Sequence, residues 1–322
     1  MTGRYLVADI GGTNARFAVA EGTAKAGFTL HHMRRFRNED FEHLRDAAHA
    51  YLQSWDGPAP QSGCLAVAAP IAPGKIRLTN STWRFETGEL ARELALKTII
   101  AANDFAAQAR GAPLCPVQDQ TVLNDAKAMA DAPISVLGPG TGLGLGLLVP
   151  CKGEVRVIAT EGGHAGFAPR TDEEIAVGKF IADEYGYVSW ERLLSGRGLV
   201  NIHRALCAID GETWPGVRPE EITARALADE TSRSHRAVML FCGALGAYAG
   251  DVSVITGARG GTYLAGGILP KIHTLLDKSP FEARRVRRGP MSRYVEAIPV
   301  RLIRSDAAAL MGAAAIAEAG GL

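Results

Sequence analysis

The N-terminal part of the sequence contains residues suited to holding a polyphosphate. Asp9 lies near the end of a run of β-forming residues, a turn of sequence Gly-Gly-Thr-Asn follows, and a second apolar run begins directly after it. Such a pattern predicts a hairpin whose tip offers backbone N–H groups. In that turn Gly11 and Gly12 allow close approach of the backbone, and Thr13 and Asn14 can donate hydrogen bonds. Asp9 can hold a magnesium ion directly or through a water.

This first segment alone leaves an alternative open, because glycines are also common in exposed hairpin turns that need positive φ. A second glycine turn, between apolar residues 134–137 and 143–149, favours the phosphate interpretation. It contains Gly138, Gly140, Thr141 and Gly142, and it has the form of a diverged second copy of the first hairpin. Two phosphate-binding hairpins predict a clamp around a nucleotide.

A third element, residues 260–270, ends a predicted strand with the pair Gly266 and Gly267 just before a predicted helix. The three elements in this order resemble the superfamily of sugar kinases, heat-shock ATPase chaperones and actin. The resemblance implies an α/β fold with two actin-like (ribonuclease H-like) domains around a central cleft. It also implies that Gly266 and Gly267 contact the adenosine part of ATP.

The best candidate for a catalytic base is Asp104, which with Asn103 follows an apolar strand and precedes a helical pattern. A carboxylate at a strand end is well placed to accept the proton of a hydroxyl that attacks a phosphoryl group. The alternative is that Asp104 only caps the following helix.

Three further polar residues could bind sugar hydroxyls: Glu161 and His164 in a glycine-rich segment, and Glu191 on a predicted amphipathic helix over residues 180–194. A carboxylate accepts hydrogen bonds, and a neutral imidazole both donates and accepts them. Taken alone, His164 is equally consistent with a structural turn residue and Glu191 with a surface glutamate.

Together these motifs resemble the bacterial glucokinases of the proteobacterial type over almost the whole chain. The resemblance implies that Asp104 is the general base for the sugar 6-hydroxyl and that the other hydroxyls are held by Asn80, Asn103, Glu161, His164 and Glu191. It implies ATP and Mg²⁺ as cofactors and a homodimer. One departure is Pro139, where the family often has alanine, because proline removes an N–H donor from the second hairpin.

Strands that alternate with helices position these residues in α/β layers. We expect a small domain over residues 1–108 plus about 303–322, and a large domain over residues 109–302. The superfamily resemblance implies that the last helix returns to the first domain. An almost wholly apolar stretch, residues 237–250, predicts a core helix.

Composition excludes several classes of partner. The chain of 322 residues has 35 basic and 34 acidic residues, so its charge gives no case for a nucleic-acid or membrane partner. The cluster Arg284-Arg285-Val286-Arg287-Arg288 is expected to be a solvated face, with an anion site as the alternative. Five isolated cysteines without a CxxC pair favour reduced thiols and a cytoplasmic location, and argue against the zinc motif of the ROK sugar kinases.

The glucokinase resemblance therefore implies an ATP-dependent phosphorylation of D-glucose at the 6-hydroxyl. Kinases for mannose, fructose or glucosamine remain alternatives, because epimers differ by one hydroxyl contact. A sugar-sensing regulator without catalysis and a chaperone-like ATPase remain alternatives from other classes. ADP or polyphosphate also remain open as phosphoryl donors.

Overall fold

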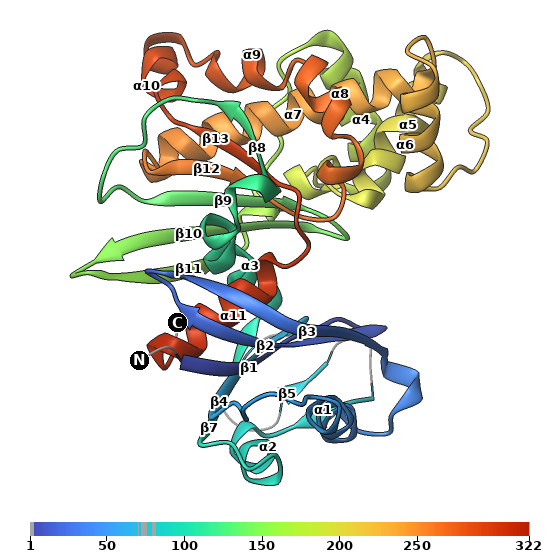
Figure 1. Cartoon of the computed structure of the whole chain (residues 1–322). Helices are drawn as coiled ribbons and strands as arrows, with labels where there is room; N and C mark the ends of the chain where they lie inside the picture. Colours follow the sequence, from blue (N-terminus) through green and yellow to red (C-terminus); the bar gives the residue numbers. More distant parts are fainter. Residues whose placement is uncertain (1–2, 70, 72–75, 79–81, 322) are drawn as a thin grey trace. The chain divides into compact units, whose positions relative to one another are not determined.

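The computed structural model describes residues 3–69, 71, 76–78 and 82–321 (Figure 1). Asn80 lies outside the described residues. The chain forms two compact units: Met1–Asp119 with Arg156–Ile158 and Ser305–Leu322, and Gln120–Val155 with Ala159–Arg304. The first unit thus extends beyond residue 108, because the turn Ala112–Leu114 still packs against the last helix.

The first unit is built on a five-stranded sheet. In spatial order its strands are β3 (Gly27–Arg37), β2 (Asn14–Thr23), β1 (Gly3–Ile10), β4 (Ser62–Val67) and β7 (Thr98–Asn103). The first three strands are antiparallel neighbours, whereas β1, β4 and β7 are parallel. Because parallel strands end at the same edge of a sheet, the last residues of β1 and β7 lie at one edge. A separate pair, β5 (Ile76–Arg77) and β6 (Arg84–Phe85), forms a small ribbon.

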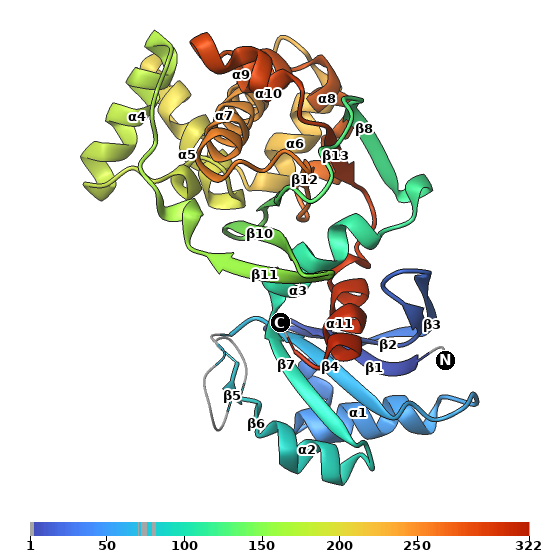
Figure 2. The ribbon, with the colours of Figure 1, turned by 90° about the vertical axis from the view of Figure 1, so that its left-hand side faces the viewer.

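Alternate side chains of β1 enter two different cores, as the two-residue period of a strand requires. Leu6, Ala8 and Ile10 pack with α1 (Leu44–Gln53) and α2 (Thr87–Glu93). Val7 points the other way, and its core includes residues of α3 (Asp104–Gly111) and α11 (Ala308–Ala319). Figure 2 shows these two helical layers on opposite faces of the sheet.

The last helix, α11, packs against α3 at a point where both helices carry glycine. A Cβ on Gly111 would overlap the backbone of Ala308, and a Cβ on Gly312 would overlap the backbone of Ala107. The two backbones therefore approach closely, and this contact fixes α3, which begins with Asp104.

The second unit contains a six-stranded sheet with helices on it. The strand order is β11 (Glu154–Thr160), β10 (Leu143–Cys151), β9 (Ile134–Pro139), β12 (Gly261–Leu264), β13 (Val300–Ile303) and β8 (Gln120–Asn124). The helices are α4 (Asp172–Tyr185), α5 (Gly196–Ile209), α6 (Pro219–Ala228), α7 (Arg233–Thr256), α8 (His273–Lys278), α9 (Phe281–Val286) and α10 (Ser292–Glu296).

Helix α7 is the core helix that the apolar stretch 237–250 predicts. It is long and apolar enough to cross a membrane, but 78% of its most apolar window is buried inside the protein. It contacts α5, α6, α9 and β9 (Figure 1). Burial against other helices and a strand accounts for its hydropathy.

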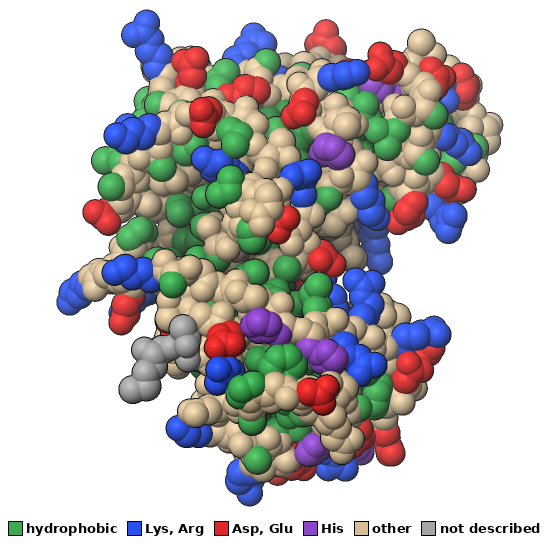
Figure 3. Space-filling model, in the orientation of Figure 1, with side chains coloured by type: hydrophobic (Ala, Val, Ile, Leu, Met, Phe, Trp, Pro, Cys, Tyr) green, Lys and Arg blue, Asp and Glu red, His purple; other side chains and the backbone are tan. Residues whose placement is uncertain are grey.

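On the face shown in Figure 3, charged side chains of both signs are interspersed.

The predicted helix over residues 180–194 is wrong in its second half. Helix α4 ends at Tyr185, because Gly186 follows with a φ of 75°, a conformation that favours glycine. Glu191 instead lies in a short 3₁₀ turn, Trp190–Arg192.

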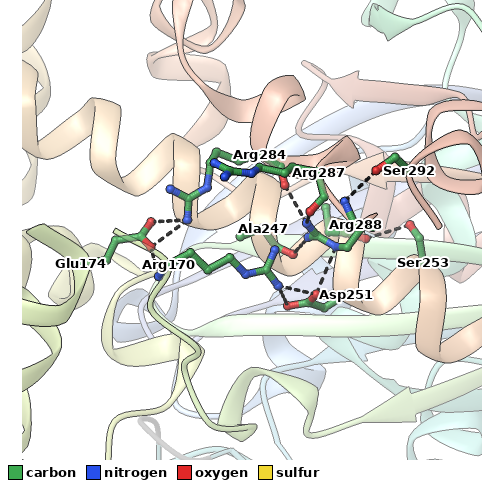
Figure 4. Close-up of polar contacts among 10 residues, drawn as sticks. Arg170, Glu174, Ala247, Asp251, Ser253, Arg284, Arg287, Arg288 and Ser292 are labelled. Atoms are coloured by element: carbon green, nitrogen blue, oxygen red, sulfur yellow. Dashed lines mark hydrogen bonds and ion pairs between the residues drawn. The ribbon is translucent and has the colours of Figure 1, made fainter. Parts of the chain in front are cut away.

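In the arginine cluster 284–288 Arg287 is exposed, but the other three arginines do not form the solvated face that the sequence predicts. Arg285 is fully buried, and the side chains of Arg284 and Arg288 expose only 15% and 7% of their surface. Arg284 donates two 2.7 Å hydrogen bonds to the buried carboxylate of Glu174. Arg288 is 3.1 Å from Asp251, which also accepts hydrogen bonds from Arg170 (Figure 4).

Burial lowers the pKa of Arg288 to about 10, and the charge of Asp251 opposes that shift. The carboxylates that pair with these arginines come from α4, α7 and α9 itself. The cluster therefore joins three helices through charge pairs, and two of its partners, Glu174 and Asp251, lie too far away in the sequence for local composition to indicate them.

Glu174→Gln should lower the free energy of unfolding by about 3 kcal/mol, because it leaves the buried guanidinium of Arg284 without a compensating charge. Asp183→Asn is the matched control on the same helix, since Asp183 pairs with Lys179 at the exposed surface and should change stability by at most about 0.5 kcal/mol. Urea unfolding of both variants measures the difference. Equal stabilities would show that the buried pair contributes no more than the exposed one.

Candidate active site

The first hairpin has the conformation that its glycines predict. β1 and β2 pair antiparallel up to Ile10 and Ala15, and the turn is closed by a 2.9 Å hydrogen bond from Gly11 N–H to the carbonyl of Asn14. Gly11 and Gly12 are partly exposed, and Thr13 and Asn14 are exposed. The turn thus leaves hydrogen-bonding groups accessible to a ligand.

Asn38 supports this hairpin from the end of β3, a role that the sequence analysis missed. Its side-chain amide donates to the carbonyl of Gly11 at 2.9 Å, and its backbone N–H donates to the carbonyl of Thr13 at 2.9 Å. Because Asn38 is buried and bonded on both sides of the tip, it holds the turn in one conformation. Only the tertiary pairing of β2 with β3 brings it there, so no local motif indicates it.

Beside the hairpin lies a hollow of about 450 Å³ that contains both charge signs. Arg16 donates to Asp9 and to Asp306, each at 2.5 Å. Arg35 is 3.7 Å from Asp306 at the same place. The hollow therefore offers two guanidinium groups and two carboxylates next to the backbone N–H groups of the turn, a combination that suits a phosphate with a bound cation.

Asp104 lies at the start of α3, directly after β7. The N-cap is Asn103, whose Oδ1 accepts hydrogen bonds from the N–H groups of Phe105 at 3.0 Å and Ala106 at 3.1 Å. Asp104 accepts one bond from Phe105 N–H at 2.8 Å. The alternative that Asp104 is merely the helix cap is therefore wrong, because Asn103 has that position.

The environment of Asp104 opposes its ionised form. Burial raises the pKa of this carboxyl above its usual range, and the charge of Asp9 at the same sheet edge raises it further. Hydrogen bonds from Phe105 N–H and the Asn103 side chain lower it, but the net shift is upward. A carboxylate with a raised pKa is a better proton acceptor, which suits a general base.

The second hairpin also forms, with β9 and β10 paired from Pro139 and Leu143 outward. Gly138 lies within β9 and pairs with Gly144, so it is not at the tip. Gly140 N–H donates to the carbonyl of Gly142 at 2.8 Å and closes the turn. Among the described residues, the N–H groups of Thr141 and Gly142 have no hydrogen-bond partner, so these are the donors that the tip can offer to a ligand.

The segment with Glu161 and His164 forms a 3₁₀ turn, Gly162–His164, against this hairpin. A Cβ on Gly163 would overlap the carbonyl of Leu143, so the turn packs directly on β10. Tyr187 donates to the carbonyl of His164 at 3.1 Å. His164 and Glu161 are both exposed at this turn.

Glu191 lies in the neighbouring 3₁₀ turn and reaches the hairpin. Its Oε2 accepts a 2.9 Å hydrogen bond from Leu143 N–H. Trp190 N–H donates to the carbonyl of Ala165 at 2.9 Å, which ties this turn to the His164 segment. The structure therefore brings the hairpin tip, His164 and Glu191 together.

Two hollows of the second unit flank Thr141. One, of about 430 Å³, is lined by His164, Glu191, Gly142, Tyr187 and others. The other, of about 370 Å³, is lined by Gly140, Gly267, Lys271 and residues of α5 and α6. Gly266, with a φ of 91°, packs against the carbonyl of Pro139 and so positions Gly267. Glu161 does not line the hollow that contains Glu191.

Arg197 lines both hollows and Lys271 lines the second, and the sequence analysis identified neither. Each follows a glycine turn by a few residues but has no motif of its own. Their positive charge beside the hairpin is suited to phosphate groups.

Among the described residues, no group of three or more His, Cys, Asp or Glu side chains could hold a metal ion. A resident metal site is not needed for Mg²⁺ that binds with a nucleotide, because this ion keeps several waters and takes one or two carboxylates besides phosphates. The carboxylate of Asp9, which lies in the same hollow as that of Asp306, fits such an ion.

The sequence matches known glucokinases over nearly its full length. The glucokinase family profile matches residues 6–320. The chain is 40% identical to a glucokinase of Chromobacterium violaceum over 312 residues, which cover 96% of this chain and 88% of the relative.

Solved structures of glucokinases resemble this chain as well. A glucokinase from an Antarctic psychrotroph superimposes with a TM-score of 0.92 at 36% identity, covering 98% of this chain and 99% of the other. A ROK family glucokinase from Streptomyces griseus, solved with glucose and AMPPNP, gives a TM-score of 0.63 at 19% identity, covering 99% and 100%. The second likeness concerns the fold alone. The predicted actin-like sugar-kinase fold and the predicted family are both confirmed: the chain belongs to the glucokinase family.

Proposed function

We propose that this protein is a glucokinase that transfers the γ-phosphoryl group of ATP to the 6-hydroxyl of D-glucose, the first step of glycolysis, in the cytoplasm. The observation that carries the proposal is the placement of Asp104: a half-buried carboxylate with a raised pKa, fixed by its own helix start, at the same sheet edge as the first hairpin. Family membership over nearly the whole chain supports the choice of glucose and ATP.

Asp104 accepts the proton of the 6-hydroxyl while that oxygen bonds to the γ-phosphorus and ADP leaves. Asn103 caps the helix that begins with Asp104 and so fixes the position of this residue. The remaining sugar hydroxyls bind to Asn103, Glu161, His164 and Glu191, and Asn80 completes this set by resemblance.

The phosphates of ATP bind at the two hairpins. The first offers Asp9, Gly11, Gly12, Thr13 and Asn14. The second offers the open N–H groups of Thr141 and Gly142, and Gly138 and Gly140 form the backbone beside them. Gly266 and Gly267 lie on the adenosine side. Asp9 would hold Mg²⁺, which neutralises phosphate charge when it is bound. We also propose a homodimer without a nucleic-acid or membrane partner.

Asp104→Asn should lower kcat by roughly 10²–10⁴-fold, the range typical of a general base, and should change glucose affinity much less. Asp277→Asn, at an exposed carboxylate of α8 outside the site, is the control and should retain kcat. Coupled assays of ATP turnover against glucose, mannose, fructose and glucosamine measure both effects and the sugar preference. Near-full turnover by Asp104→Asn would remove this residue from the role of base.

The same assay separates the rival functions. Sugar binding without sugar-dependent turnover would support a regulator, and ATP turnover that no sugar changes would support a chaperone-like ATPase. ADP and polyphosphate in place of ATP test the identity of the donor.

The raised pKa of Asp104 predicts the pH dependence of the reaction. Because the base must be ionised, kcat/KM should fall as the pH is lowered through this pKa, at a pH above the usual Asp value of about 3.9. A pH profile of kcat/KM on glucose measures this acidic limb. A profile that stays flat down to about pH 4 would contradict the assignment.

A further inference from the structure

The hydrogen bond between Glu191 and Leu143 joins two parts of the site that the proposed function treats separately. Glu191 belongs to the sugar side, whereas Leu143 directly follows the phosphate hairpin. Leu143 N–H donates to Glu191 Oε2 at 2.9 Å. A carboxylate accepts through both oxygens, so Oε1 stays available for a sugar hydroxyl.

Both partners of this bond are held by further hydrogen bonds. On the Glu191 side, the backbone carbonyl of Glu191 accepts a 2.8 Å hydrogen bond from Ser195 Oγ. The backbone carbonyl of the following residue, Arg192, accepts a 3.0 Å hydrogen bond from the side chain of Asn201. On the hairpin side, Gly140 accepts from Gly196 N–H at 2.8 Å in addition to closing its own turn. The carboxylate and the hairpin tip therefore cannot move independently without breaking hydrogen bonds.

Gly142 shows why this contact needs glycine. A Cβ at this position would lie 2.6 Å from Glu191 Oε2, which is closer than a Cβ approaches a non-bonded atom. Gly142 is not among the glycines with positive φ, so its backbone conformation does not require glycine. The absence of a side chain instead lets the Glu191 carboxylate reach Leu143 N–H.

We propose that the tip of the second hairpin is a positioning element of the sugar site, in which Leu143 N–H orients the Glu191 carboxylate. This inference rests on the proposed function, in which Glu191 binds a sugar hydroxyl. Sugar affinity then depends on the conformation of the loop that also holds the nucleotide phosphates. Since coupling between two ligands is reciprocal, each ligand changes the affinity of the other by the same factor.

The test measures glucose binding by calorimetry in the absence of nucleotide. Gly142→Ala should weaken glucose binding by roughly tenfold, because the new methyl group displaces the carboxylate from a charge-assisted hydrogen bond. Gly178→Ala on α4, outside the site, is the control, since its Cβ would lie in ordinary contact 3.5 Å from Phe167, and its glucose affinity should equal that of the wild type. Equal glucose affinities in both variants would overturn the proposal.

The second readout is the factor by which a non-hydrolysable ATP analogue with Mg²⁺ changes glucose affinity. We expect the analogue to change the glucose affinity of the wild type at least fivefold, which is within the usual range of such coupling. In Gly142→Ala it should leave the glucose affinity about the same. A merely structural role of Gly142 would lower stability without removing this factor, so thermal unfolding is recorded for each variant. A wild-type factor of one would overturn the proposal.

If Gly142→Ala does not fold, Glu191→Gln and Glu191→Asp replace it. The glutamine amide oxygen reaches Leu143 N–H, whereas aspartate is one methylene too short, so the coupling factor should persist in the first and vanish in the second. Equal factors would overturn the proposal. Absence of glucose binding and turnover in the wild type would instead contradict the proposed function itself.

Discussion

A backbone N–H group can hold a phosphate only if its turn is rigid and the group is not already bonded. Both hairpins meet the first condition by different means. The first is braced by Asn38, and the second by the bonds of Gly140 to Gly142 and Gly196. Rigid donors need no reordering when the ligand binds, and this preorganisation is what makes such loops effective.

The second condition, that the N–H group is not already hydrogen-bonded, holds for only some donors of the second hairpin. Gly140 N–H closes the turn and Leu143 N–H binds Glu191, which leaves Thr141 and Gly142 as open donors among the described residues. Pro139 supplies no N–H. Proline instead of alanine at position 139 therefore removes none of the N–H groups that are open to a ligand. Residue 139 belongs to β9, where it pairs with Leu143, and the open donors are Thr141 and Gly142.

At Asp104 two opposing electrostatic effects can be ranked. A position in the first turn of a helix and a hydrogen bond from Phe105 both favour the ionised carboxylate. The net pKa shift is nevertheless upward, so burial and the charge of Asp9 outweigh them. This balance keeps the carboxylate basic while its geometry stays fixed, and it arises because β1 and β7 end at one sheet edge.

The sequence predicted what depends on short segments. Both glycine hairpins, the strand before Asp104 and the core helix α7 follow from local patterns of apolar residues and glycines. It was wrong where the partner is distant: Glu191 is in a 3₁₀ turn because Gly186 ends α4, and Arg284 and Arg288 are largely covered because Glu174 and Asp251 meet them. Asn38, Arg197 and Lys271 were missed for the same reason. Glycines show the limit most clearly, because one residue type has three separate causes here: Gly266 for its positive φ, Gly312 for helix packing, and Gly142 for the approach of a carboxylate. Sequence shows that a side chain is absent, whereas only the fold shows which neighbouring group occupies its place.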